Sequence, residues 1–286
     1  MNGILLVDKE KGVTSRDVVN EVAHFFNTKK VGHTGTLDPI ATGILVICLG
    51  NCTKLVEILS SEEKEYIATI KLGIKTDTGD ITGNVIEKKD YNITKQTLEN
   101  VLKSFVGEIT QTVPIYSAVK VNGKKLYQYA RNNEKVELPK RKVLIKSIEL
   151  IDFKDDEITL KTSVSKGTYI RSLIEDICTK LNTVGTMREL RRTRQGNYKI
   201  DGCFTIDEIK SKNYKIISKE EVLTYFETYI LNDEEFLKIK NGAVIPKNFK
   251  TDYCVFKYQK KVVAIYQTYH RDESLAKPFK MFVEDI

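Results

Sequence analysis

The chain has 286 residues, of which 41% are hydrophobic and 30% are charged, and its formal net charge at pH 7 is +7. This composition is typical of globular proteins with room for one sizeable domain and a smaller one, and it excludes a membrane-spanning protein because no apolar run is long enough to cross a bilayer. The five cysteines are an odd, scattered set that completes no zinc site, so we expect reduced thiols in a cytoplasmic protein. We also expect a monomer.

Apolar runs and helical spacing define the elements of the first hundred residues. Gly3–Asp8 and Ile44–Gly50 are continuous apolar runs and predict buried strands, and Glu65–Gly73 alternates apolar and polar residues as a strand does. Ser15 is the predicted N-cap of a helix that extends to Phe26.

The next hundred residues add helices to a growing sheet. The predicted elements are a helix over Thr94–Phe105 with a capping threonine, a strand pair over Lys142–Phe153 and Glu157–Ser165, a helix over Tyr169–Leu181 and a basic strand over Met187–Arg194. These elements do not form regular βαβ repeats, so the fold class is α+β with a large sheet.

Beyond residue 210 the chain changes character. Residues 210–230 are charged and predict a helical connector, and the short apolar runs that follow predict a small all-β module. A module of that size buries little surface alone, so we expect it to dock against the main body.

The stretch KVGHTGTLDPIATG, residues 30–43, contains the first candidate site. Its glycines match neither a Walker loop nor a dinucleotide fingerprint, which argues against a phosphate-loop enzyme. Asp38 before a proline is often only a turn initiator. Here His33 lies in the same loop of small residues, and this combination favours a site at Asp38.

A second candidate lies in SVSKGTYIRSL, residues 163–173. Arg171 falls in the first turn of a predicted helix, where the helix dipole mildly disfavours a cation. A carboxylate partner would offset that cost, and Asp38 is one candidate. Pairing with solvent or a neighbouring acid is an equally weighted alternative.

Two basic segments are candidates for RNA contact. The stretch between Pro114 and Val143 interleaves tyrosines with Lys120, Lys124 and Arg131, a mixture suited to stacked bases and phosphates. Arg188 and Arg192 lie close together on the predicted basic strand. A solvated helix with buried tyrosines would look similar, so composition alone does not decide.

Several long segments together resemble one family. KVGHTGTLDPIATGILVICLG is similar to the catalytic motif of the TruB family, the synthases that make pseudouridine 55 in the T loop of tRNA. GILLVDKEKGVTS, KEYIATIKLGIKTDTGDITG, YSAVKVNGKKLYQYAR and SKGTYIRSL resemble other segments of that family, in its order. One departure is Glu10, because the family usually has a proline after the lysine at this position.

The resemblance implies a fold and a division of the chain. It implies a pseudouridine synthase core with a long mixed, mostly antiparallel sheet over residues 1–229, carrying an RNA-contacting insertion at about residues 114–143. Residues 230–286 would form a small β-barrel-like, PUA-like RNA-binding domain. The partner would be the T stem-loop of tRNA, with no metal, cofactor, obligatory protein or guide RNA.

The resemblance also implies roles for individual residues. Asp38 would act as nucleophile or base, by attack at C1′, attack on the base or glycal formation, and Arg171 would pair with it. The residues at base-contacting positions are His33, Tyr66, Tyr169 and Leu190. We further expect RNA contacts from Lys9, Lys120, Lys124, Arg131, Arg188 and Arg192.

Two other functions stay open at this point. One is an RNA-binding protein or tRNA-folding chaperone without catalysis, which the basic insertion would serve. The other is a related synthase that depends on a guide RNA and acts on ribosomal RNA. A carboxylate in the pocket favours an enzyme over a binding protein, and the long insertion favours a chain that grips RNA itself.

Overall fold

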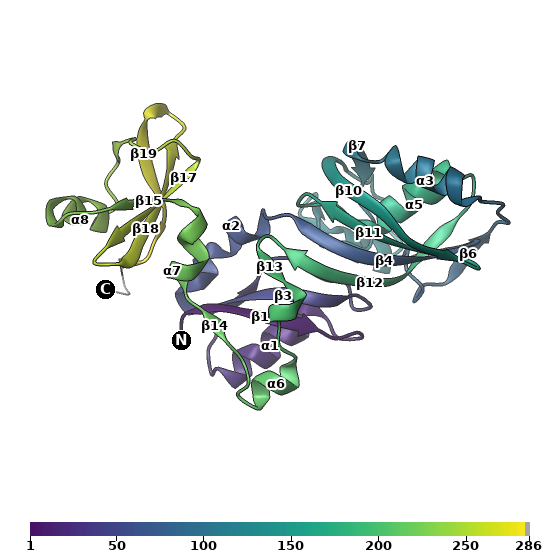
Figure 1. Ribbon diagram of the computed structural model, residues 1–286, viewed down its shortest axis with the longest axis horizontal. Helices are drawn as coiled ribbons and strands as arrows, with labels where there is room; N and C mark the ends of the chain where they lie inside the picture. The colour runs from purple at the N-terminus through teal and green to yellow at the C-terminus, as the bar shows by residue number, and fades with distance from the viewer. Residues whose placement is uncertain (284–286) are drawn as a thin grey trace.

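A computed structural model describes residues 1–283, and within that range one sheet of ten strands forms the body of the protein (Figure 1). The order along the sheet is β14-β1-β3-β12-β4-β11-β10-β7, with β2 and β13 pairing to β3 and β12. The strands of this sheet are β1 (Gly3–Lys9), β2 (Val31–His33), β3 (Thr42–Leu49), β4 (Lys64–Leu72), β7 (Gly107–Thr112), β10 (Lys140–Lys154), β11 (Glu157–Val164), β12 (Gly185–Gln195), β13 (Tyr198–Lys199) and β14 (Ile216–Ile217). Of the pairings between these strands in residues 1–283, only that of β12 with β3 is parallel.

Helices cover this sheet at both of its ends. The α-helices of the body are α1 (Ser15–Phe25), α2 (Val56–Ser60), α3 (Lys95–Lys103), α4 (Leu126–Arg131), α5 (Ile170–Lys180), α6 (Ile206–Lys210) and α7 (Lys219–Val222). Helices α3 and α5 pack on the β10–β11–β4–β12 part, and α1 and α6 pack on β1 and β3 (Figure 1). Short 3₁₀ helices span Gly50–Leu55, Ile200–Gly202 and Leu223–Tyr225.

Strands β1 and β3 are buried on both faces, which explains their continuous apolar sequence. Leu5 and Val7 face α1, whereas Ile4 and Leu6 belong to a second cluster with α2. That second cluster continues into the C-terminal module through residues that include Val262. The module therefore shares a hydrophobic core with the body.

The C-terminal module is a sheet of five strands in the order β15-β17-β18-β19-β16 within the described residues. Its elements are β15 (Glu227–Ile230), α8 (Asp233–Lys240), β16 (Ile245–Pro246), β17 (Tyr253–Tyr258), β18 (Lys261–Tyr269) and β19 (Asp272–Met281). An ion pair between Lys280 and Glu57, and a hydrogen bond from Lys54 Nζ to Met281 O of 2.8 Å, tie the module to the body.

Two small hairpins project from the body. One pairs β5 (Ile74–Thr76) with β6 (Val85–Lys88), and the other pairs β8 (Lys120–Val121) with β9 (Lys124–Lys125). The second hairpin and α4 lie between β7 and β10. We refer to this segment as the insertion.

The connector over residues 210–230 was predicted to be helical, and that prediction is wrong for most of it. After Lys210, the last residue of α6, only α7 is α-helical in this connector. Ile216–Ile217 joins the body sheet beside β1, and Glu227–Ile230 pairs in parallel with β17. Since β15 belongs to the C-terminal sheet, the module begins before the predicted boundary at residue 230.

The N-cap of α1 is Thr14 and not Ser15 as predicted. Thr14 Oγ1 accepts a hydrogen bond from Asp17 N at 3.1 Å, and Asp17 Oδ2 accepts one from Thr14 N at 2.8 Å, which is a capping box. The hydroxyl of Ser15 is then free to bind the loop that carries Asp38.

Candidate active site

A single cavity of about 450 Å³ brings together the residues that the sequence singled out. It opens on the body where the β2–β3 loop, β4, β12 and the start of α5 meet. Its lining includes His33, Asp38, Tyr66, Tyr169, Arg171 and Leu190. Residues from four separate parts of the chain thus line one cavity, whose size is in the range of ligand sites.

The loop between β2 and β3 holds Asp38 at the cavity wall. Ser15 Oγ accepts a hydrogen bond from Leu37 N at 2.8 Å and donates one to Leu37 O at 3.1 Å, so one hydroxyl fixes both backbone groups of the preceding residue. The amide of Ala41 donates to Asp38 O at 3.0 Å. These bonds fix the loop backbone that carries the Asp38 carboxylate.

Gly43 is required where this loop enters β3. Its φ is +102°, and a Cβ at this position would lie 2.2 Å from Arg192 O. A side chain would therefore push β3 away from β12, and the parallel pairing that supports the Asp38 loop would open.

Asp38 and Arg171 form a two-bond ion pair. Arg171 Nε lies 2.9 Å from Asp38 Oδ2, and Arg171 Nη2 donates to Asp38 Oδ1 at 3.2 Å. The guanidinium also donates to Thr78 O at 3.0 Å and to Tyr116 O at 2.8 Å. Only a planar group with several donors makes all four contacts, so the arginine fixes both the position and the plane of the carboxylate.

Arg171 lies in the first turn of α5, and its side chain is only 7% exposed. A cation at a helix N-terminus opposes the helix dipole, and a buried cation requires compensation. Asp38 and the two backbone carbonyls supply that compensation. This agrees with the partner that the sequence suggested for Arg171.

The charge state of Asp38 is set by opposing effects. Burial raises the pKa of the Asp38 carboxyl, the Arg171 guanidinium lowers it, and the carboxylate of Asp80 raises it, with a net rise. The Asp38 side chain nevertheless keeps 31% exposure and has Arg171 on both oxygens. We therefore expect an ionised but poorly solvated carboxylate at neutral pH, which is a reactive form.

Sequence reasoning missed Asp80, which is buried in the β5–β6 hairpin. Its carboxylate accepts hydrogen bonds from Thr82 N at 3.0 Å and Thr78 Oγ1 at 3.1 Å. The same hairpin places the Thr78 carbonyl on Arg171. The threonine-rich and aspartate-rich segment TDTGD, residues 76–80, was the signal available in the sequence.

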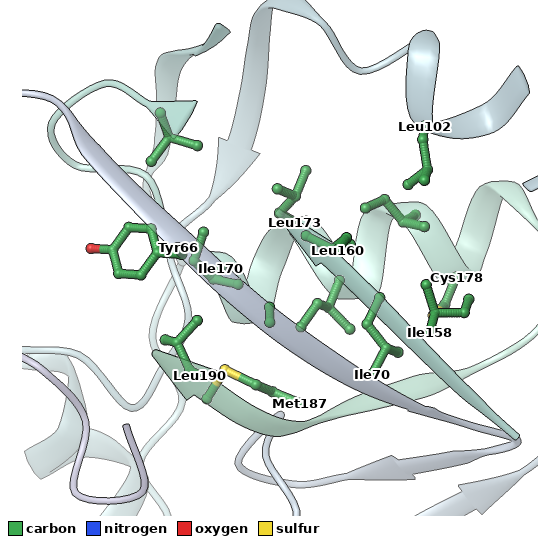
Figure 2. Packing of buried hydrophobic residues seen from close by; sticks show 14 of the residues in the cluster. Tyr66, Ile70, Leu102, Ile158, Leu160, Ile170, Leu173, Cys178, Met187 and Leu190 are labelled. Atoms are coloured by element: carbon green, nitrogen blue, oxygen red, sulfur yellow. The ribbon is translucent and has the colours of Figure 1, made fainter. Parts of the chain in front are cut away.

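Apolar side chains form the floor of the cavity. Tyr66 and Leu190 belong to the cluster of the main sheet and are buried. Figure 2 shows the ring of Tyr66 at one end of that cluster, near Ile170 and Leu190, with its hydroxyl directed away from the apolar side chains. An aromatic face and an aliphatic side chain suit the two faces of a planar base.

His33 and Tyr169 lie on the cavity wall. Burial lowers the pKa of His33, and the positive charges of Arg16 and Arg192 lower it further, so the imidazole is neutral at neutral pH. His33 Nδ1 accepts a hydrogen bond from Gly35 N at 3.3 Å. Tyr169 is the N-cap residue of α5, directly before the helix that carries Arg171.

Two of the predicted RNA-contacting residues are not on the surface. Lys9 is fully buried, and its ammonium donates to Glu10 O at 2.8 Å, Val13 O at 2.7 Å and Pro39 O at 3.3 Å. Arg192 is also buried, and it donates to Ile44 O at 2.7 Å and Gly35 O at 3.1 Å. Both cations donate to backbone carbonyls of the Asp38 loop. Lys9 is fully buried outside the cavity lining, so the prediction that it contacts RNA is wrong in the structure. Arg192 is in the lining of the cavity, and its contact with RNA stays a prediction.

The remaining predicted contacts lie outside the cavity lining. Lys120 and Arg131 are exposed in the insertion, where Arg131 lies 5.4 Å from the centre of the Tyr127 ring. Lys124 pairs with Glu134, and Arg188 pairs with Glu157 on the sheet.

A further cation, Lys64, lines the cavity and was missed. Its ammonium donates to Ser60 O at 2.8 Å and Glu62 O at 2.6 Å. Burial lowers the pKa of Lys64 to about 8, and the charge of Arg192 contributes.

In residues 1–283 there is no group of three or more His, Cys, Asp and Glu side chains placed to hold a metal ion. None of the helices in that range has the length and apolar character needed to cross a membrane.

Comparison with protein families gives two matches that together cover most of the chain. Residues 23–170 match the TruB family pseudouridylate synthase N-terminal domain, and residues 171–238 match the tRNA pseudouridylate synthase B C-terminal domain. A relative named tRNA pseudouridine synthase B from Caldicellulosiruptor saccharolyticus is 47% identical over 242 residues, covering 85% of this chain and 83% of that protein. One of the same name from Staphylococcus aureus is 43% identical over 304 residues, covering 98% and 99%.

Solved structures agree with this assignment at the level of the fold. A chain in the structure titled "Crystal Structure of a Cbf5-Nop10-Gar1 Complex" is similar with a TM-score of 0.74 and 25% identity, over 99% of this chain and 86% of that one. The likeness confirms the predicted α+β class, with a long mixed sheet and a small curled β domain at the C-terminal end.

Proposed function

The chain belongs to the TruB family of pseudouridylate synthases and is a tRNA pseudouridine synthase, an isomerase; on that premise we propose that its target is uridine 55 in the T loop and that Asp38 is the catalytic group. The observation that supports this most directly is the carboxylate of Asp38, held on both oxygens by Arg171 at the wall of a cavity with an apolar floor.

The reaction requires a group with the properties of Asp38. Pseudouridine forms when the N1–C1′ bond breaks, the uracil turns and a C5–C1′ bond forms; C5 loses a proton and N1 gains one. No electron is gained or lost in total. An ionised carboxylate can attack C1′ or the base, or it can take a proton from C2′ to give a glycal, and all three routes use the same oxygen atoms.

The cavity supplies the other requirements. A uridine in a folded loop must leave its stack to reach Asp38, which costs a few kcal/mol. Tyr66 offers an aromatic face to the displaced base and tolerates its rotation, and Leu190 and Tyr169 close the wall around it. Exclusion of water protects the separated sugar and base from hydrolysis.

In this proposal the insertion and the C-terminal module hold the rest of the RNA. Lys120 and Arg131, exposed in the insertion, offer cations to the phosphates of the RNA backbone, and Tyr127 lies beside Arg131. We propose that the module is a PUA-like RNA-binding domain and that the T stem is held outside the cavity without a partner protein.

The test uses the purified chain alone with a T stem-loop RNA. Mass spectrometry after nuclease digestion, and chemical labelling of pseudouridine read by primer extension, give the yield and the position. We expect pseudouridine at the position that corresponds to 55 and none in a hairpin in which cytidine replaces that uridine. Modification elsewhere, or no modification, would contradict the proposal.

The same experiment addresses two other functions. A chain that only bound RNA, through the cations and tyrosines of the insertion, would bind the hairpin without modifying it. A synthase that depends on a guide RNA would need added RNA and protein partners before any modification appeared.

A further inference from the structure

Several hydroxyl side chains line the cavity without a role in the proposed reaction, and that of Ser117 differs from others there, such as Ser60 and Thr168, in having no hydrogen-bond partner among the described residues. Ser117 lies between β7 and β8, lines the cavity and is only 7% exposed. Its backbone is satisfied, since its N–H donates to Ile115 O at 2.9 Å and its carbonyl accepts from Tyr127 N at 3.1 Å. Its Oγ, in contrast, has no hydrogen-bond partner among residues 1–283.

A buried hydroxyl without a partner is unusual, because it has lost its hydrogen bonds to water and gained none. Ser172 provides a direct comparison in the same region. It is also 7% exposed, and its Oγ donates to Thr112 O at 2.8 Å. The absence of a partner at Ser117 is therefore not a general consequence of burial in this part of the protein.

Ser117 is also tied to the ion pair. The carbonyl of the preceding residue, Tyr116, accepts a hydrogen bond from Arg171 Nη2 at 2.8 Å, and the same nitrogen donates to Asp38 Oδ1 at 3.2 Å. The backbone beside Ser117 is thus fixed relative to the carboxylate. Asp38 and Ser117 line the same cavity, so a nucleotide bound at Asp38 lies in a space that has Ser117 on its wall.

We infer that the Ser117 hydroxyl hydrogen-bonds to the uridine nucleotide in this cavity and helps to bind it, an inference that rests on the proposed function. A hydroxyl both donates and accepts, so it can serve a carbonyl oxygen, an N–H or a ribose hydroxyl of the same nucleotide. The partner that the free protein lacks is supplied by the substrate. Ser117 is then a substrate-binding residue that also links the insertion to the reaction centre.

The inference predicts opposite effects on activity and stability. Ser117→Ala removes a group that is unsatisfied in the free protein, so the melting temperature should stay the same or rise. The substrate loses its partner, so kcat/KM on the T stem-loop RNA should fall roughly tenfold. Ser172→Ala is the matched control for stability: it breaks a satisfied buried hydrogen bond and should lower the melting temperature.

The measurements are kcat/KM by pseudouridine yield and the melting temperature, on the same preparations of wild type and both variants. A Ser117→Ala variant whose kcat/KM is within twofold of wild type would overturn the inference while leaving the proposed function intact. A melting temperature lowered as much as in Ser172→Ala would also overturn it, because the hydroxyl would then be structural. A wild-type chain that makes no pseudouridine would overturn the proposed function and this inference with it.

Discussion

Replacing Asp38 with asparagine is the most direct perturbation of the proposed reaction centre. The amide has nearly the same size and keeps one oxygen for Arg171, and the bonds that hold the loop through Ser15 and Ala41 are unchanged. It cannot act as an anionic nucleophile or as a base. We expect the rate of pseudouridine formation to fall by at least about 10³-fold, the scale of losses when a nucleophile or its base is removed from an active site.

The effect on stability should be small because two large terms oppose each other. At the distances of 2.9 and 3.2 Å between Arg171 and Asp38, the attraction is about 5 to 6 kcal/mol at an effective dielectric constant of 20. Desolvation of the carboxylate costs several kcal/mol, and burial raises the pKa of Asp38, which shows that the charged form is held at a cost. Arg171 also keeps the carbonyls of Thr78 and Tyr116 in the variant. We expect a net change within about 2 kcal/mol of zero, or a shift in melting temperature of less than about 8 °C.

The assay combines three measurements on Asp38→Asn and wild type in one buffer. Filter binding gives the affinity for tRNA, single-turnover experiments at saturating protein give the rate, and calorimetry gives the melting temperature. We expect affinity close to that of wild type, because phosphates are bound elsewhere and a negative charge has been removed from the cavity. A variant that keeps more than about a tenth of the wild-type rate would refute the assignment of Asp38 as the catalytic group.

Three further predictions concern cations. Arg171→Lys should lower the single-turnover rate by about 10- to 100-fold at unchanged tRNA affinity, because an ammonium cannot span both carboxylate oxygens; a rate near wild type would show that one point charge suffices. Burial lowers the pKa of Lys9 from 10.5 to about 8, so between these pH values the unfolded chain binds more protons than the folded one. Wild type should therefore gain stability relative to Lys9→Met as the pH rises from 8 to 10.5. Melting temperatures of both proteins at pH 7 and 9.5 test this, and a difference between them that does not change with pH would contradict it. Lys120→Ala should reduce the slope of log affinity against log salt by about one, with little change in the rate at saturation; an unchanged slope would remove Lys120 from the RNA contacts.

Much of the fold was predictable because local signals and tertiary packing agree. The runs in β1 and β3 are apolar on both faces and are buried on both faces, and Thr94 caps α3 as its sequence indicates. The prediction for the connector was wrong because its local signal and its tertiary packing disagree. The segment 227–230 is short and lies in a charged region, and it forms a strand by pairing with β17, which lies more than twenty residues further along the chain.

The candidate site was predictable in its members but not in the environment of its charges. Asp38 and Arg171 are 133 residues apart, and their pairing was one of the possibilities suggested by the cost of placing a cation at a helix N-terminus. The burial of Lys9 had a local signal that was overlooked: strand alternation places it on the same face of β1 as Leu5 and Val7, which pack under α1. The missing partner of Ser117 had no such signal, because it is a property of the assembled cavity.

The position of β12 in the sheet has a consequence for how the protein folds during its synthesis. It lies between β3 and β4 in the sheet, although it follows both of them in the chain. During synthesis, the edges of β3 and β4 that will receive it remain unpaired until residues 185–195 emerge, and unpaired edges invite association with other chains. Asp38 belongs to the half built on β3, and Arg171 to the half built on β4. In the part of the chain that the structure describes, β12 joins these two halves of the sheet, so the reaction centre is held together by a strand that is made after both of its charged residues.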